Sequence, residues 1–311
     1  MKKLIALTLV VMLCVSMAAC TSSGNGSASA DFTVGICQLM EHESLDKATQ
    51  GFKAALDAAL KAEGKTVAYE EQVAGGTDLC TTVVGTFTAK NVDLIMANAT
   101  PALLAAANAT TTIPVLGTSV TDYADTFSGN IPANVSGTSD AVPFDEQAQM
   151  MIDTLKLVAG DQVGVLYCSD ESNSKIQYEA VKKLFEDKGI VVKAYTFSET
   201  TELQTLVTTA CGECKAIYVP SDNTVADNDS IVGTICSEKK IPVYTSYGGA
   251  ICYASLAIDY YALGEETGKM AAEILLGKKT PADIEIATLT PAVVYNADLC
   301  ADLGIAVPED K

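Results

Sequence analysis

Asp222 and Asn223 are the two residues whose position most clearly asks for a chemical explanation. They follow Ala216 to Pro220, an apolar stretch typical of a buried strand, and both a carboxylate and an amide are costly to bury without hydrogen-bond partners. Residues of these types commonly cap the helix that follows. They can also hold a polar ligand, and we expect both roles, because a helix N-terminus in a cleft can serve both.

Polar side chains also end the other apolar stretches of the chain. If those stretches are parallel strands, their carboxyl ends meet at one edge of a sheet, which is where ligands collect in open parallel sheets. The candidate ligand-binding residues at or near these ends are Gln38, Thr100, Thr118, Ser119, Asn173, Ser174, Asp222, Asn223, Tyr247 and Asp259. Asp259 also directly precedes an apolar helical stretch, where an aspartate is more often the N-cap.

These residue types suit a small polar or zwitterionic ligand. Hydroxyl groups and backbone N–H groups at helix starts bind carboxylates. The candidates with hydroxyl groups are Thr100, Thr118, Ser119 and Ser174. An ammonium group needs a carboxylate or an amide oxygen, which Asp222 offers together with Asn173 or Asn223. Tyr247 or Phe144 could stack on an aromatic ligand side chain.

The chain lacks the sequence motifs of common enzymes. It contains one histidine, His42, and no GxSxG, HExxH, P-loop GxxxxGK[ST] or Rossmann glycine pattern. Paired carboxylates could still perform acid–base chemistry, because 39 acidic residues always offer pairs. We therefore expect a binding protein rather than an enzyme, and we expect no cofactor.

Ten cysteines are many for a chain of this length. Most fall inside apparent strands or helices, so we interpret them mainly as small buried hydrophobic residues. Cys211 and Cys214 form a CxxC pattern, but no second such pattern or histidine pair accompanies it, which argues against a redox or metal role. Cys37, Met40 and His42 lie close enough in sequence to suggest a soft-metal site. Three donors on one loop are weak support, and we predict no bound metal.

The elements that must position these residues alternate strictly between strand and helix. The first run comprises residues 32–38, 45–64, 66–74, 81–91, 92–98, 100–111 and 113–119, beginning with a strand. The second run comprises residues 162–168, 174–189, 191–197, 200–212, 216–220, 224–239 and 241–247 in the same order. Strict alternation predicts parallel sheets flanked by helices, and short motifs recur in both runs. We therefore predict an α/β protein with two similar Rossmann-like lobes.

The N-terminus has the features of an export signal. A basic start, Met1 to Lys3, precedes an apolar run from Leu4 to Met17 and small residues directly before Cys20. This pattern resembles a bacterial lipoprotein signal, which implies that residues 1–19 are a signal peptide and that Cys20 is lipid-modified. The Gly- and Ser-rich residues 20–30 predict a flexible tether.

The charge of the chain argues against nucleic-acid partners. It has 39 acidic and 20 basic residues, and a surface of that sign repels phosphate backbones. Apolar residues make up 49% of the chain and fall in periodic runs, so we expect a folded body rather than a disordered one.

Six segments of the chain together resemble a known family. They are EHESLDKATQGF (41–52), NATPALLAAA (98–107), GTSVTDY (117–123), ESNSKIQ (171–177), YVPSDNTV (218–225) and AIDYYALGEETGKMAAEILLG (257–277). They are similar to the ABC-transporter substrate-binding protein family that includes tryptophan-binding lipoproteins of the TrpX type. The resemblance spans residues 31 to 308. Cys37, Cys168 and GGTDLC (75–80) depart from the pattern of this family and leave the identity of the ligand open.

The resemblance implies a type I periplasmic-binding-protein architecture, in which two lobes joined by a three-segment hinge close around a ligand. It places residues 31–136 plus 257–287 in an N-terminal lobe and residues 137–256 plus 288–311 in a C-terminal lobe. It also implies a lipid-anchored, extracytoplasmic protein that captures an amino acid, aromatic and tryptophan-like, and delivers it to an ABC permease in the membrane. A sensory receptor of the same fold and a binding protein for a sugar or nucleoside stay open as alternatives.

Overall fold

The structure is a computed structural model that describes residues 30–307. Residues 1–29 and 308–311 lie outside the described residues, and so do the predicted signal peptide and the predicted lipid-bearing Cys20. Between residues 30 and 307, no helix combines the length and the apolar character needed to cross a membrane.

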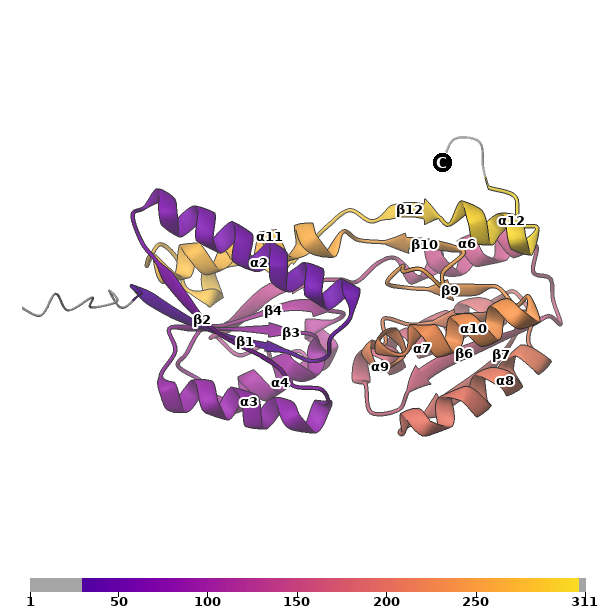
Figure 1. The fold of residues 1–311 in the computed structure, drawn as a ribbon, viewed down its shortest axis with the longest axis horizontal. Coiled ribbons are helices and arrows are strands. Elements are labelled where there is room, and N and C mark those ends of the chain that lie inside the picture. The colour runs from indigo at the N-terminus through magenta and orange to yellow at the C-terminus, as the bar shows by residue number, and fades with distance from the viewer. Residues whose placement is uncertain (1–29, 308–311) are drawn as a thin grey trace, which may run out of the picture. The chain divides into compact units, whose positions relative to one another are not determined.

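The first half of the fold is built on a six-stranded parallel sheet (Figure 1). Its strand order is β11-β5-β4-β3-β1-β2. The strands are β1 (Phe32–Gln38), β2 (Val67–Val73), β3 (Leu94–Asn98), β4 (Val115–Val120), β5 (Val135–Ser139) and β11 (Ala287–Thr288). Every residue of β3, β4 and β5 is buried, as expected for central strands of a covered parallel sheet. The carboxyl ends of β1 and β3 lie side by side, because Gln38 pairs with Asn98.

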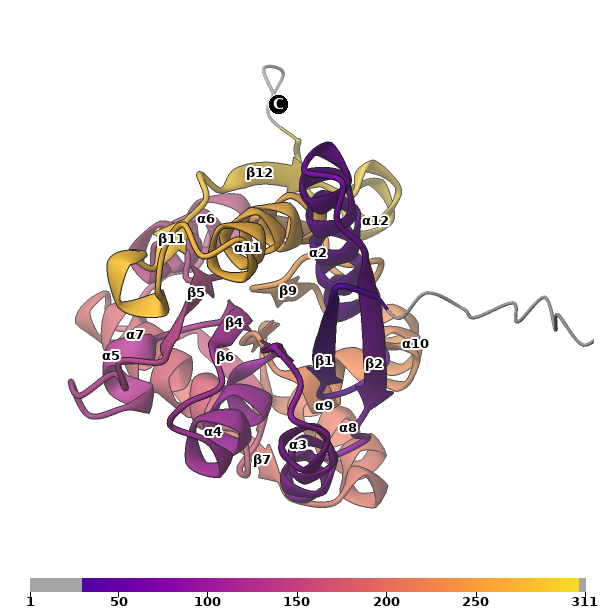
Figure 2. The same ribbon diagram turned by 90° about the vertical axis from the view of Figure 1, so that its left-hand side faces the viewer.

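Helices cover both faces of this sheet, as the alternation of elements predicts. Figure 2 shows α3 (Thr77–Lys90) and α4 (Thr100–Ala109) on one face, with α2 (Glu43–Ala62) and α11 (Tyr260–Leu275) on the other. A single turn, α5 (Tyr123–Thr126), follows β4.

Helices α2 and α11 approach so closely that glycines are required where they cross. A Cβ atom on Gly264 would lie 1.9 Å from the carbonyl oxygen of Ala48, and one on Gly51 would lie 2.0 Å from that of Tyr261. Because no side chain fits in those spaces, glycine fixes the contact. This contact holds α11, which comes late in the chain, against the first half.

The second half is built on a four-stranded parallel sheet with the order β7-β6-β8-β9. Its strands are β6 (Gln162–Cys168), β7 (Val191–Phe197), β8 (Ala216–Val219) and β9 (Val243–Thr245). One face is covered by α8 (Leu203–Glu213), α9 (Asn223–Asp227) and α10 (Asp229–Lys239). The other face is covered by α6 (Phe144–Leu155), α7 (Ser172–Asp187) and α12 (Ala297–Leu303). A single 3-10 turn, η1 (Thr200–Glu202), leads into α8.

The chain passes between the two parallel sheets three times. The first passage follows β5, the second lies between β10 (Ala254–Ala257) and α11, and the third lies between β11 and β12 (Ala292–Tyr295). Strands β10 and β12 pair with each other in antiparallel fashion, and η2 (Pro281–Asp283) precedes β11. The first passage begins after Ser139, because β5 still pairs with the first sheet at that residue. The predicted lobe boundaries themselves stay a prediction.

Some predicted element boundaries are wrong. The helix predicted at 224–239 is two helices, α9 and α10, because the backbone of Asn228 is not helical and its side-chain amide turns back to donate to the carbonyl of Thr224 at 2.8 Å. The helix predicted at 81–91 begins at Thr77, so the segment 75–80 contributes its first turn.

Candidate ligand-binding site

Two adjoining cavities lie at the carboxyl ends of the strands. The inner cavity has a volume of about 10 Å³, which is room for about one water molecule. The outer cavity has a volume of about 580 Å³, which lies within the usual range of small-molecule pockets. The residues that line both cavities are His42, Ser44, Ala226, Tyr247 and Tyr260. The two cavities therefore form one continuous site with a narrow interior and a wide mouth.

Three polar atoms around the inner cavity are buried without hydrogen-bond partners. They are Ser119 Oγ, Asp140 Oδ1 and Asn173 Oδ1, and all three residues line this cavity. Within residues 30–307, six buried polar side-chain atoms lack a partner, so half of them converge on a space for one water. Because buried polar groups in native proteins are nearly always satisfied, this convergence makes the cavity the candidate site for a polar ligand.

Asp140 follows β5 directly and lies against the first turn of α11. Its Oδ2 accepts a hydrogen bond of 2.9 Å from the hydroxyl of Tyr260. Burial raises the pKa of Asp140, although hydrogen bonds from Tyr260 and Thr121 oppose the shift. A positive charge beside Asp140 would favour its ionised form and would compensate for its burial.

Ser119 has a left-handed backbone with a φ angle of 55°, which is uncommon outside glycine. It lies where the pairing of β4 with β5 shifts register, between Gly117 and Val120. This irregularity sets the residue apart from regular strand geometry beside the inner cavity. Backbone strain of this kind is concentrated at functional sites in proteins.

Asp222 and Glu171 cap the short helix α9 from within the protein. Asp222 Oδ1 accepts from the backbone N–H of Val225 at 2.8 Å, and its Oδ2 accepts from that of Cys168 at 2.7 Å. Glu171 accepts from the backbone N–H groups of the two residues that follow Asp222. Burial, and then the charge of Glu171, raises the pKa of Asp222. The capping role expected of Asp222 is thus observed, whereas its contact with a ligand stays a prediction.

Two hydrogen bonds join the first half to the second at the inner cavity. His42 Nε2 lies 3.3 Å from Asn223 Oδ1, and Gln177 Nε2 donates to Thr121 Oγ1 at 3.3 Å. Burial lowers the pKa of His42, so its ring is neutral near pH 7 and a proton on Nε2 can be donated to the amide oxygen of Asn223.

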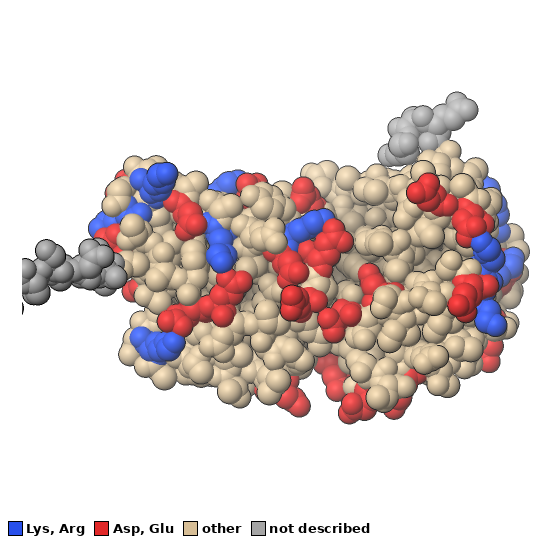
Figure 3. Space-filling view, in the orientation of Figure 1, with Lys and Arg blue, Asp and Glu red and all other residues tan. Residues whose placement is uncertain are grey.

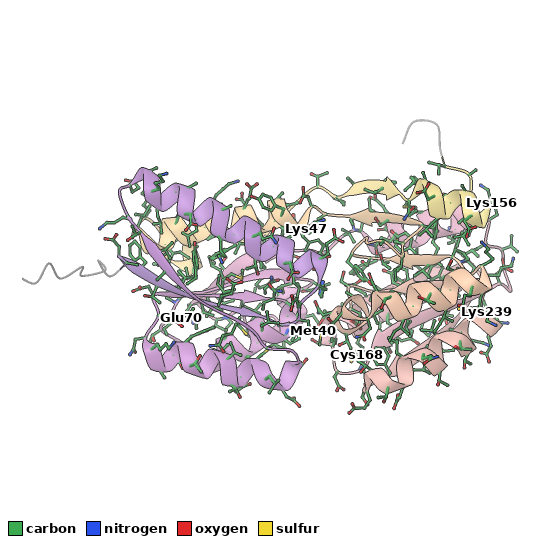
Figure 4. The ribbon with its side chains drawn as sticks, in the orientation of Figure 1. Met40, Lys47, Glu70, Lys156, Cys168 and Lys239 are labelled. Carbon is green, nitrogen blue, oxygen red and sulfur yellow. The ribbon has the colours of Figure 1, made fainter. Side chains whose placement is uncertain are left out.

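The outer cavity combines aromatic and acidic side chains. Its aromatic side chains are Tyr247, Tyr260 and Tyr261. The hydroxyl of Tyr247 donates to Asp229 Oδ1 at 2.7 Å, and burial raises the pKa of Asp229 to about 6 despite this bond. Lys47, on α2, forms an ion pair of 2.6 Å with Glu43 at the mouth (Figure 4). Acidic side chains gather in the middle of the same face of the molecule (Figure 3).

Six of the ten residues predicted for the site line one of the two cavities. They are Ser119, Asn173, Asp222, Asn223, Tyr247 and Asp259, the last only in the outer cavity. Asp259 is also the N-cap of α11, where it accepts from the backbone N–H groups of Tyr261 and Ala262.

Gln38, Thr100, Thr118 and Ser174 line neither cavity. The side-chain amide of Gln38 accepts a hydrogen bond of 2.6 Å from Thr49 and donates one of 2.7 Å to Asp46. Thr118 lies 3.2 Å from the hydroxyl of Thr138 inside the first half. Ser174 bonds to the buried pair Asn173 and Asp222, so it supports site residues from behind. The fourth, Thr100, is buried in the first turn of α4.

Phe144, a second candidate for stacking on a ligand, belongs elsewhere. It packs against the core cluster between the second sheet and helices α6, α7 and α12, and it lines neither cavity. Tyr260 takes its place, because it lines both cavities.

Sequence analysis missed several residues that line the inner cavity, notably His42, Thr121, Asp140 and Tyr260. Asp140 follows a buried strand just as Asp222 does, which is the signal that would have identified it. It was missed because β5, with the sequence VSGTS, contains little that is apolar and was not predicted as a strand.

The residues considered for a soft-metal site have other neighbours. The thiol of Cys37 is hydrogen-bonded to Cys80, and His42 contacts Asn223. Figure 4 shows Met40 and Cys168 at the facing ends of the two sheets. In the described part of the chain, no three His, Cys, Asp or Glu side chains are arranged to hold a metal ion.

Comparisons with known proteins show the family of this chain. The family model for ABC transporter substrate binding proteins matches residues 33–310. A protein of Clostridioides difficile (strain R20291) named tyrosine-binding protein is 33% identical over 319 residues, which cover 96% of this chain and 91% of that protein.

Solved structures give the same result. The ABC domain of Streptococcus pneumoniae in complex with L-Trp is 31% identical, with a TM-score of 0.79, and the match covers 89% of this chain and 96% of that one. A ligand-free, open substrate-binding protein from Clostridium difficile is 32% identical, with a TM-score of 0.66, and covers 90% and 97% of the two chains.

More distant solute-binding proteins, 14% and 15% identical with TM-scores of 0.61 and 0.63, share the fold alone. These matches confirm the predicted type I periplasmic-binding-protein architecture. The matching family is non-enzymatic, as predicted. Because the family model spans nearly the whole described body and the similarity to the tyrosine-binding protein covers 96% of the chain, this protein belongs to the family of ABC transporter substrate-binding proteins.

Proposed function

We propose that this protein is the extracytoplasmic, lipid-anchored component of an ABC importer and that it captures a free aromatic amino acid. The names of two relatives support this ligand class, because one is called a tyrosine-binding protein and the other was solved with L-Trp. The observation that carries the proposal is the convergence of three unpartnered polar atoms on the inner cavity.

The three atoms match the head group of an amino acid. Asp140 Oδ1 and Asn173 Oδ1 are acceptors, and together they suit the three donors of an ammonium group. The hydroxyl of Ser119, which has no partner, can donate to a carboxylate. The head group therefore occupies the inner cavity, with its positive end toward Asp140.

The side chain of the ligand then extends into the outer cavity. Tyr247 and Tyr260 line both cavities, so they contact the ligand at the point where its ring begins. Tyr261, whose exposed fraction is 38%, lies at the mouth. An aromatic side chain fits the volume of about 580 Å³ and the ring-lined wall better than a sugar, which would need more hydrogen-bonding groups there.

Binding requires the two halves to move. An inner cavity of about 10 Å³ is too small for an ammonium and a carboxylate, so the ligand enters an open form, and the halves then close on it less tightly than they close here. The higher TM-score against the L-Trp complex than against the open, ligand-free protein supports a closed arrangement here. In this proposal the moving lobes are residues 31–136 plus 257–287 and residues 137–256 plus 288–311, and the three passages form the hinge.

Closure also explains delivery. A permease that recognises only the closed, liganded form accepts loaded protein and ignores empty protein. Lipid modification of Cys20 would keep the protein at the membrane beside that permease. The membrane fraction of producing cells tests the anchor: the protein should be found there, and a Cys20→Ser variant should be released into the soluble fraction.

Titration calorimetry tests the ligand. The protein is unfolded and refolded to remove carried ligand, then titrated with each common amino acid, with sugars and with nucleosides. We expect saturable binding of tyrosine or tryptophan. Binding of sugars or nucleosides alone would retain the transport role and overturn the amino-acid assignment.

A further inference from the structure

Two cysteines of neighbouring helices lie thiol to thiol beneath the surface of the second half. Cys211, near the end of α8, and Cys236, near the end of α10, have their Sγ atoms 3.4 Å apart. Both side chains belong to the core cluster that these helices form with the second sheet, with exposed fractions of 7% and 2%. A disulfide would require the two sulfur atoms to approach from this distance to the bond length of about 2.05 Å.

The pairing differs from the one that the CxxC pattern suggests. The thiol of Cys214 lies 3.5 Å from the hydroxyl of Tyr195 on β7, so it turns toward a different neighbour from Cys211. Cys211 instead faces a residue 25 positions further along the chain. Only one cysteine of the CxxC pattern, Cys211, therefore belongs to this longer-range pair.

The surroundings of the pair favour oxidation. Cys236 lines a cavity of about 190 Å³ beside α12, with Ile241 and Leu299 among the other lining residues, so a small oxidant has a route to its sulfur. The hydrogen bond from Cys236 lowers the pKa of Cys211, and the positive charge of Lys239 adds to this effect. Lys239 is the last residue of α10 (Figure 4). A thiolate is the form of cysteine that reacts with a disulfide oxidant.

We propose that Cys211 and Cys236 form a disulfide that ties α8 to α10. Formation removes one proton and one electron from each thiol and creates one S–S bond. The two electrons reduce one disulfide of the oxidant, which leaves as two thiols, by way of a mixed disulfide with one of the two cysteines. In cells this step rests on the proposed export, because disulfides persist in oxidising compartments.

The bond would stabilise the second half without touching the ligand site. Neither cysteine lines the inner or the outer cavity. A cross-link that closes a loop of this length restricts the unfolded chain, and for a protein of this size we expect a midpoint of thermal unfolding higher by about 5–10 °C. Amino-acid affinity should be the same in the oxidised and the reduced protein, so failure of this proposal is distinguishable from failure of the proposed ligand.

Peptide mapping of the unaltered sequence is the direct test. The reduced protein is treated with oxidised glutathione, both in its native state and during refolding, and remaining thiols are alkylated under denaturing conditions before digestion. We expect one peptide pair that joins Cys211 to Cys236, a mass lower by two hydrogen atoms, and loss of the pair on reduction. Recovery of both cysteines as alkylated peptides under both conditions would overturn the proposal, as would a link from Cys211 to Cys214.

Matched variants add a functional readout. Cys236→Ala should abolish the rise in unfolding midpoint on oxidation, whereas Cys214→Ala, three residues from Cys211, should retain it. If Cys236→Ala fails to fold, the mapping of the unaltered protein still decides the question. An equal midpoint for oxidised and reduced wild-type protein, with the link present, would refute the stabilising role.

Discussion

Replacing Asp140 by asparagine tests the proposed head-group site most sharply. The substitution keeps the size of the side chain and an oxygen that can accept from the hydroxyl of Tyr260. It removes the negative charge that we assign to the ligand ammonium. The affinity for the amino acid should fall, because a neutral amide replaces a carboxylate in a buried, charge-assisted hydrogen bond.

The expected size of the loss follows from the kind of bond. Hydrogen bonds to charged groups contribute about 1.5–3 kcal/mol, so Asp140→Asn should raise Kd by about tenfold to a little over a hundredfold. Titration calorimetry on ligand-stripped protein measures this directly. An unchanged Kd would refute the assignment of the ammonium to Asp140.

The stability of the ligand-free protein should change in the other direction. Burial raises the pKa of Asp140 in the folded state above its unfolded value, so its ionisation costs stability as pH rises from the unfolded to the folded pKa. The amide in Asp140→Asn does not ionise, so the midpoint of this variant without ligand at neutral pH should be equal to that of wild-type protein or higher. A lower midpoint together with lower affinity would indicate a structural role instead.

Asp222→Asn is the matched control. Both oxygens of Asp222 already accept from backbone N–H groups, so the amide should weaken the cap of α9 and lower stability by about 0.5–2 kcal/mol. We expect a smaller loss of affinity than for Asp140→Asn. The reverse order would assign the ammonium to Asp222, as the sequence alone suggested.

The remaining predictions concern pH, the ring-lined wall and the helix crossing. Affinity should fall as pH is lowered from neutral, because protonation of Asp140 removes its charge while the α-ammonium group of the zwitterionic ligand keeps its proton, and Asp140→Asn should flatten this dependence in calorimetry. Tyr247→Leu should weaken binding of aromatic amino acids by about two- to tenfold, whereas Tyr247→Phe should nearly retain it; equal affinities would exclude ring contact. Gly264→Ala should destabilise the fold by about 1–3 kcal/mol or more, because its Cβ would lie 1.9 Å from the carbonyl oxygen of Ala48. Exposed Gly85, which has free space around it in α3, is the control, and Gly85→Ala should stabilise by about 0.5–1 kcal/mol in denaturant unfolding.

The alternation of elements was sufficient to predict the parallel sheets because it reflects local periodicity. The strands β1, β3 and β6 are apolar runs of the expected length, and each is followed by an amphipathic or apolar helix. The break at Asn228 was not predictable in the same way, because a single side-chain bond to Thr224 decides it. The same holds for β5, whose residues are small and polar and become a strand only through pairing with β4.

The site was predictable where a polar residue follows an apolar strand. Asn173, Asp222 and Asn223 were identified by that rule, and they line the inner cavity. The rule failed for Gln38 because long-range packing supplied it with a partner, Thr49, that no local pattern indicates. It also failed for Tyr260, which belongs to the site only because its helix crosses back to the first half.

The central claim is that the unpartnered atoms of the inner cavity bind the head group of an aromatic amino acid. Its most direct test is the titration of ligand-stripped wild-type protein and of Asp140→Asn with tyrosine and tryptophan, each compared with its analogue that lacks the α-amino group. We expect tight binding of the amino acid by wild-type protein, a large loss of affinity without the α-amino group, and a much smaller difference between the two ligands in Asp140→Asn. Equal binding of the amino acid and its deaminated analogue by wild-type protein would contradict the claim.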